Sequence, residues 1–143
     1  MATHHGIALA LREAINRGDM LGPRIIACNQ PICATGGHAS EVCVEADGAD
    51  NVRHAARTQL KLGADFIKVM ASHDPYPMPW DEQTRAELTL EEIRAAYEEA
   101  HKWGKKAACH VMGKVALRNV IEAGADIIDH GTYLDDKLAQ LMA

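Results

Sequence analysis

The sequence predicts an α/β fold built on a parallel sheet. Stretches with the apolar spacing of helices alternate along its 143 residues with short, unalternating apolar runs, a pattern typical of parallel βαβ units. Two joints, "LGADFIKV" and "AGADIIDH", are nearly identical, and each places a glycine, a small residue and an aspartate before a buried run. Aromatic residues make up only 4% of the chain, so aliphatic residues and alanine must fill the core.

Four short apolar runs are the predicted strands. They cover residues 24–29, 65–70, 106–110 and 126–130. Long connections follow the first two strands, over residues 30–47 and 71–88, and loops of this length are uncommon unless they are functional. Both follow the carboxyl ends of strands, where α/β and barrel folds place their chemistry.

Five amphipathic stretches are the predicted helices. They cover residues 6–19, 49–63, 89–104, 114–124 and 134–143. Thr89 and Glu92 form a T-x-x-E capping box, which satisfies orphan N–H groups at a helix start. Lys61 and Gly63 supply a cation in the last turn and a stop beyond it. The alternation fits half of an eight-stranded barrel as well as a small doubly wound sheet.

Composition excludes several classes of function. The net charge of -5 comes from mixed acidic and basic residues, so we expect no nucleic-acid partner. No apolar run approaches the roughly 20 residues of a membrane helix, so we expect no membrane span. The four cysteines form no C-x-x-C pair and the chain shows no leader. We therefore expect one cytoplasmic domain over residues 1–143, without disulfides.

Lys68 stands in the middle of the predicted strand 65–70. Because side chains alternate along a strand, Lys68 shares one face with Phe66 and Met70. A buried ammonium is unfavourable, and burial favours the neutral amine. Three interpretations follow: a structural lysine paired with a carboxylate, a Schiff-base nucleophile, or an amine carboxylated by carbon dioxide that becomes an anionic metal ligand.

Histidines end the next two predicted strands, at His110 and His130. Equivalent ends of neighbouring βα units converge at one rim, so we expect both to face Lys68. Two imidazoles and one oxygen anion bind zinc-like ions and leave a position open for water. Each histidine alone is also compatible with a hydrogen-bonded core residue. Cys109 should point to the opposite face, into the core.

"GADFIKVMAS", "ACHVMG" and "IDHGTYLDD", with "TGGH" at residues 35–38, resemble the metal-dependent amidohydrolase superfamily, in its imidazolonepropionase-like and Xaa-Pro dipeptidase branch. The resemblance covers almost the whole chain and implies a partial (β/α)8 TIM barrel, about strands three to six. It implies that Lys68 is carboxylated and bridges two metal ions, and that His110 and His130 bind one of them. The expected ion is zinc, one or two per complete family member and at most one here.

Two parts of the family pattern have no counterpart in the sequence. These are the H-x-H motif of the first strand and the aspartate of the eighth strand, which is both ligand and general base. His4 and His5 are adjacent and precede a helix, so we expect them in a disordered start rather than on a metal. The chain therefore corresponds to a single incomplete barrel domain, and no catalytic general base is assigned.

The resemblance implies hydrolysis of amide or peptide-like C–N bonds, in a dipeptide or cyclic amide, by a metal-activated water. His38, Tyr133 and Trp80 are the candidate substrate contacts. Each has a simpler interpretation: His38 as an exposed loop residue, Tyr133 as a ring packed on the next helix, and Trp80 as part of a surface excursion.

Two other functions remain open from the sequence. "GADFIKVMAS" also resembles the lysine strand of deoxyribose-phosphate-type aldolases, in which Lys68 would form a Schiff base without metal, although this gives the two histidines no role. A non-catalytic barrel fragment is the third alternative. Its open sheet edges would be covered by the remainder of the barrel or by a second copy, so we expect self-association.

Overall fold

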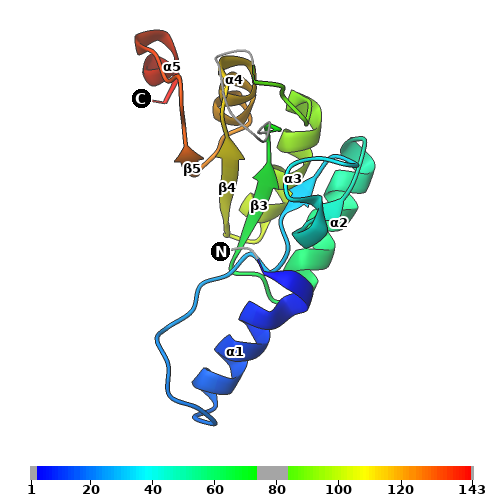
Figure 1. Ribbon diagram of the computed structural model, residues 1–143, viewed down its shortest axis with the longest axis vertical. Helices are drawn as coiled ribbons and strands as arrows, with labels where there is room; N and C mark the ends of the chain where they lie inside the picture. Colours follow the sequence, from blue (N-terminus) through cyan, green and yellow to red (C-terminus); the bar gives the residue numbers. More distant parts are fainter. Residues whose placement is uncertain (1–2, 74–83, 143) are drawn as a thin grey trace.

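A five-stranded parallel sheet forms the centre of the protein, with the spatial order β2-β1-β3-β4-β5. The computed structural model describes residues 3–73 and 84–142 (Figure 1). The strands are β1 (Ile32–Cys33), β2 (Val44–Glu45), β3 (Phe66–Met70), β4 (Lys106–Val111) and β5 (Ile127–His130). The α-helices are α1 (Ile7–Asn16), α2 (Ala49–Lys61), α3 (Leu90–Lys102), α4 (Lys114–Glu122) and α5 (Asp136–Leu141).

Helices α2, α3 and α4 pack against β1, β3 and β4, while α1 lies beyond the amino ends of the strands (Figure 1). Ile67 and Val69 of β3 and Cys109 of β4 join the buried core between sheet and helices. Lys68 and His110 alternate with them and therefore belong to the opposite face of the sheet. The predicted α/β class is confirmed, and so is the core position of Cys109.

The two nearly identical joints make the same backbone clamp. Asp65 donates its N–H to the Ala27 carbonyl (2.8 Å), and its carboxylate accepts the Ala27 N–H (2.9 Å). Asp126 repeats both bonds with Ala107, at 2.8 and 2.7 Å. Each aspartate thus ties the residue before a strand to the neighbouring segment and fixes how the two segments align.

The capping box at the start of α3 is present as predicted. Thr89 accepts the N–H of Glu92, and the Glu92 carboxylate accepts the N–H of Thr89 at 2.7 Å. Glu92 also accepts the N–H of Gly48, at the start of α2 (2.7 Å). One side chain therefore links the beginnings of two neighbouring helices.

The strand predicted over residues 24–29 is wrong. That segment forms no part of the strand ladders, and β1 and β2 fall instead within the predicted connection 30–47. Asn29 has a φ of +64°, which ends the extended run, and Pro31 has no N–H to donate. The sheet bonds resume at Ile32, which pairs with both Val44 and Val69.

The start of the chain also differs from the expectation of disorder. Residues His4–Gly6 form a short 3-10 turn before α1, with His5 at a φ of 47°. Arg12 of α1 binds the Asp65 carboxylate at 2.7 Å and the Gly63 carbonyl at 3.0 Å. The first helix is therefore anchored to the joint before β3.

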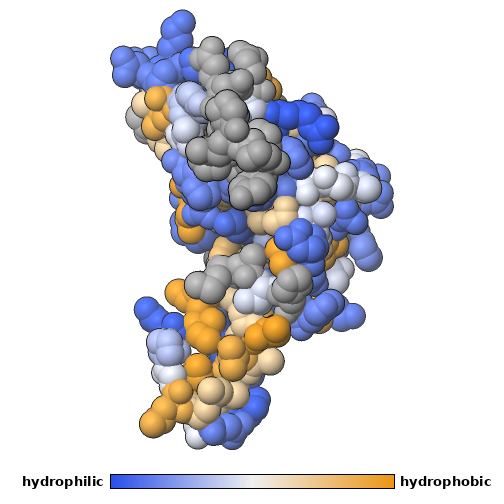
Figure 2. All heavy atoms as spheres, in the orientation of Figure 1, coloured by the Kyte–Doolittle hydropathy of each residue, from blue (hydrophilic) through white to orange (hydrophobic). Residues whose placement is uncertain are grey.

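Apolar side chains gather at the lower end of the molecule, where Figure 1 places α1 and the segment after it (Figure 2). Leu11 of α1 and Ile26 line one cavity of about 420 Å³ with their neighbours. The large exposed apolar residues of these two segments, which we call the α1 patch, are Ile7, Leu11, Met20, Leu21 and Ile26. Across residues 3–73 and 84–142, no helix is long and apolar enough to cross a membrane.

Candidate functional site

His110 and His130 meet at the carboxyl ends of β4 and β5. Their ring centroids lie 4.8 Å apart, with the rings near perpendicular at 74°. Val111 is the register partner of His130, so His130 lies one position further along the sheet than His110. His130 has a φ of 70°, in the left-handed region that non-glycine residues rarely adopt. With this backbone conformation, His130 no longer follows the alternation of side chains between the two faces of the sheet. The predicted proximity of His110 and His130 is confirmed.

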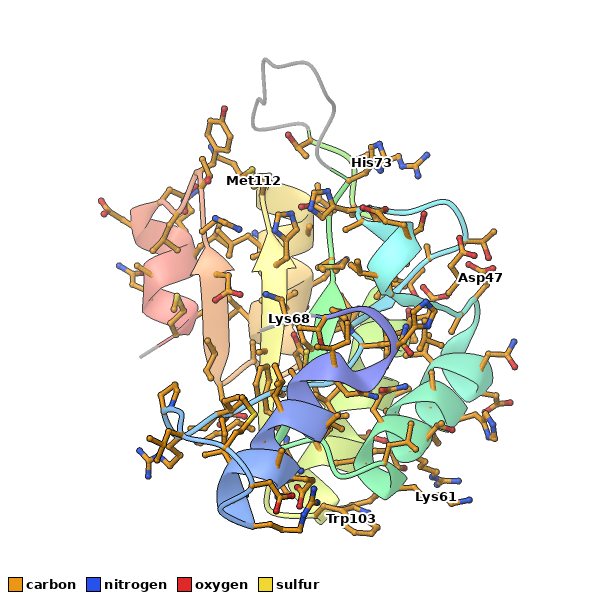
Figure 3. The ribbon with its side chains drawn as sticks, turned by 60° about the horizontal axis from the view of Figure 1, so that its bottom comes forward. Asp47, Lys61, Lys68, His73, Trp103 and Met112 are labelled. Atoms are coloured by element: carbon orange, nitrogen blue, oxygen red, sulfur yellow. The ribbon has the colours of Figure 1, made fainter. Side chains whose placement is uncertain are left out.

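Lys68 lies lower on the same sheet, opposite Ala108 in the neighbouring strand. Figure 3 shows it midway along the strands, with His73 and Met112 near their carboxyl ends. Its ammonium forms an ion pair with the carboxylate of Asp129 on β5. The Lys68 side chain is 15% exposed and that of Asp129 is 41% exposed. The unmodified lysine therefore has the carboxylate partner of the first interpretation.

Asp129 is the functional-site residue that sequence reasoning missed. It is the register partner of His110, which places it beside the histidine on the next strand. The signal in the sequence is its position directly before His130 in "DIIDH". Recognising it requires the pairing of β4 with β5, which no spacing along the chain reveals.

His38 stacks on His110. The two rings are nearly parallel, at 4°, with centroids 4.2 Å apart. His38 is half-buried, so it is not the solvent-exposed loop side chain of the simpler interpretation. The structure thus brings three histidines together, in the order His38, His110 and His130.

The loop that carries His38 is held by carboxylates along its backbone. The N–H of Thr35 binds Asp47 (3.0 Å) and the N–H of Gly36 binds Glu45 (2.6 Å). The hydrogen bonds from Thr35 lower the pKa of Asp47. These contacts fix residues 35 and 36 to Glu45, the last residue of β2, and to Asp47 just after it.

The two remaining predicted contacts are Tyr133 and Trp80. Tyr133 follows β5, is half-buried and has a φ of 71°. Trp80 lies outside the residues that the structure describes. Their assignment as substrate contacts stays a prediction.

The donor atoms near the histidines define what the site can hold. Within the described ranges, no group of three or more His, Cys, Asp or Glu residues is arranged to hold a metal ion. His110 and His130 offer two neighbouring imidazoles, the commonest nitrogen ligands of zinc. The unmodified Lys68 side chain has no oxygen atom, and only a carboxylated amine would add an anionic oxygen. The pair of histidines fits a metal, and a third ligand depends on Lys68.

A parallel α/β sheet with histidines at the carboxyl ends of adjacent strands is compatible with part of a (β/α)8 barrel, in which sites lie at that face. The chain belongs to the amidohydrolase family, whose family model matches residues 1–142.

Similar proteins of known structure are barrel hydrolases of this family. A Xaa-Pro dipeptidase crystallised with methionine in its active site shares 32% identity and a TM-score of 0.86, over 99% of this chain and 38% of its own. The crystal structure of ochratoxinase from Aspergillus niger shares 29% identity and a TM-score of 0.85, over 97% of this chain and 38% of its own. The predicted resemblance and the predicted partial TIM barrel are both confirmed.

Sequence comparison gives the same relationship. The chain is 29% identical to Aspergillus niger ochratoxinase over 163 aligned residues, which cover 96% of this chain and 34% of that protein. The chain therefore spans little more than a third of the length of the relatives it matches.

Proposed function

We propose that this chain supplies part of the active site of a metal-dependent hydrolase that cleaves amide or peptide-like C–N bonds in small molecules. The observation that carries the proposal is the pair His110 and His130, 4.8 Å apart at adjacent strand ends in an amidohydrolase-family sheet. A dipeptide is the substrate class favoured by the similarity to a Xaa-Pro dipeptidase, and a cyclic amide is the second substrate class in this proposal.

His110 and His130 hold the divalent ion in this proposal, and zinc is the ion that best suits two imidazoles. When bound, the ion supplies Lewis acidity and lowers the pKa of water. Lys68 adds an oxygen ligand once it is carboxylated. Carboxylation would make the end of the Lys68 side chain an anion, which cannot pair with the Asp129 carboxylate, so the ion pair and the carboxylated form exclude each other.

His38, Tyr133 and Trp80 contact the substrate in this proposal. The support for His38 is direct geometry, because its ring lies against that of His110. A polar ring at this rim is within reach of a carbonyl or carboxylate bound beside His110. Tyr133 is supported by its place directly after β5. Trp80 is supported only by its sequence position between prolines, because it lies outside the described residues.

The other half of the site has to come from elsewhere, either from the remainder of a barrel or from a second copy of the chain. Among residues 3–73 and 84–142, strands β2 and β5 are the edges of the sheet, and sheet edges present backbone groups for further strands. We also propose a cytoplasmic location, on the cysteine pattern of the sequence.

Metal content tests the function. We expect protein grown with zinc and bicarbonate to retain about one ion per chain, and His110→Ala and His130→Ala to lose it. Lys68→Ala should lose it as well if the lysine is carboxylated. His54→Ala is the matched control, because His54 is an exposed histidine of α2. Wild-type protein without bound metal, or variants that bind as well as wild type, would refute the proposal.

The Schiff-base alternative keeps one supporting observation. Lys68 is 15% exposed and lies beside Asp129, a carboxylate able to exchange protons with an amine. Membership of the amidohydrolase family favours the hydrolase. Borohydride reduction in the presence of an aldehyde separates the two, because a covalent adduct at Lys68, lost in Lys68→Ala, would establish the aldolase chemistry.

A further inference from the structure

Glu87 lies where the connection between β3 and α3 returns to the sheet. Its N–H donates to the carbonyl of Ala71 (2.9 Å), and the N–H of His73 donates to the carbonyl of Arg85 (3.0 Å). Residues 85–87 therefore run antiparallel to residues 71–73, with a bridge between their central residues. This pairing sets the Glu87 backbone just beyond the carboxyl end of β3.

The Glu87 side chain is fully buried and points at the loop that carries His38. Its Oε1 accepts the N–H of His38 at 2.5 Å and lies 3.4 Å from Nδ1 of His73. Its Oε2 lies against Gly37, where an added Cβ would come within 2.2 Å of it. Burial raises the pKa of Glu87. A buried carboxyl group is unfavourable unless its contacts compensate, and here those contacts are made with the loop that carries His38 and with His73.

The loop is thus held from two sides. Asp47 and Glu45 bind the N–H groups of residues 35 and 36 from the edge of the sheet, and both are exposed. Glu87 binds residue 38 from the side of β3. The contact with Glu87 is therefore made by the backbone of the residue whose ring meets His110.

We propose that Glu87 is a positioning residue that holds residues 35–38 so that the His38 ring stacks on His110. The relevance to substrate rests on the proposed function, in which His38 contacts substrate and His110 holds the ion. The positioning itself depends only on the contacts of Glu87 with the loop.

NMR spectra of the histidine rings in the full, metal-free chain test this proposal. In Glu87→Ala we expect the ring signals of His38 and His110 to move together, while those of His54 and His101 keep their positions. Glu87→Gln retains an acceptor oxygen for the His38 N–H and should keep the wild-type signals. Glu91→Ala removes an exposed carboxylate four residues away and should change neither ring.

Unchanged His38 and His110 signals in a folded Glu87→Ala protein would overturn the proposal. A folded Glu87→Gln protein that behaves like Glu87→Ala would also overturn it. If Glu87→Ala does not fold, Glu87→Asp takes its place, since it keeps the charge but withdraws the oxygens by one methylene. If the His38 and His110 ring signals of Glu87→Asp matched those of wild type, the positioning role of Glu87 would also be refuted. The NMR measurement uses metal-free protein. A failure to bind zinc would therefore refute the proposed function without affecting the test of Glu87.

Discussion

Lys68 of β3 forms its ion pair with Asp129 of β5 across the whole width of β4, which lies between them. Ala108 of β4 is the register partner of Lys68. Its small methyl group leaves room for the Lys68 side chain to pass over β4 toward Asp129. Asp129 is at the same time the register partner of His110. One carboxylate therefore pairs with Lys68 and also lies beside the strand position of His110.

Replacing Asp129 by asparagine should make zinc binding less dependent on bicarbonate. The substitution removes the partner of the ammonium and also the negative charge that would repel a carboxylated Lys68. The measurement is zinc content against bicarbonate concentration for wild type and Asp129→Asn, with Asp136→Asn of α5 as control. Identical curves for wild type and Asp129→Asn would show that Asp129 does not oppose carboxylation.

Glu99 should contribute far more to stability than its neighbour Glu98. Its side chain is 4% exposed and bonds Arg53, Arg57 and Lys102. The hydrogen bond from Arg57, followed by those from Lys102 and Arg53, lowers the pKa of Glu99 to about 2, although burial raises it.

We expect Glu99→Ala to lower the free energy of unfolding by about 2–3 kcal/mol, because it leaves three cations without their shared partner. Glu98→Ala removes one bond of a 46% exposed carboxylate and should cost less than about 1 kcal/mol. Urea unfolding measures both values. Equal losses in the two variants would contradict the central role of Glu99.

Acid should destabilise the protein partly through Asp126. Burial raises its pKa, but hydrogen bonds from Lys106, Ala107 and His101 outweigh this and lower the pKa to about 2. A carboxyl group with a lowered folded pKa stabilises the fold above its unfolded pKa near 4, and this stabilisation is lost as the pH falls toward 2.

Asp126→Asn should therefore remove about 1–2 kcal/mol at neutral pH and flatten the dependence of stability on pH between about 4 and 2. Urea unfolding at a series of pH values checks the slope. A variant with the wild-type slope in this window would place the acid sensitivity in other carboxylates.

The α1 patch should drive self-association of the isolated chain. Leu21 is fully exposed and Ile26 is 58% exposed, and exposed apolar groups of this kind favour burial against another surface. We expect sedimentation velocity to show mass rising with concentration for wild type, and less so for the double variant Leu21→Ser, Ile26→Ser. Val115→Ser, at a 58% exposed position of α4, is the control. A wild-type chain that stays monomeric at all concentrations would contradict this.

The three longer strands were predictable because each apolar run lies between a helix with a clear stop and a loop. The structure places β3, β4 and β5 within one residue of the predicted bounds. Strands β1 and β2 have two residues each, and their positions follow from pairing with Val69 and with each other, which has no local signature. A run of two residues carries too little periodicity to be recognised.

The candidate site also has a part that the sequence predicts and a part that it does not. The ends of β4 and β5 predicted that His110 and His130 would meet, because neighbouring parallel strands end at one rim. His38, which stacks on His110, donates its backbone N–H to Glu87, which is 49 residues away in the sequence. The partner of Lys68 depends on a register across two strand pairs. Contacts of this kind arise from tertiary packing and leave no mark on residue spacing.

The paired clamps of Asp65 and Asp126 have a consequence for how a barrel is assembled. In a closed barrel, the stagger between strands has to add up to a fixed shear around the ring. Here Asp126 sets the stagger of β5 against β4 through its bonds with Ala107, 19 positions away. Asp65 ties the start of β3 to Ala27, 38 positions away in a segment outside the strand ladders. An open arc of strands can thus carry the tilt of a full ring before any closure, and this arc matches a barrel more than twice its length with a TM-score of 0.86.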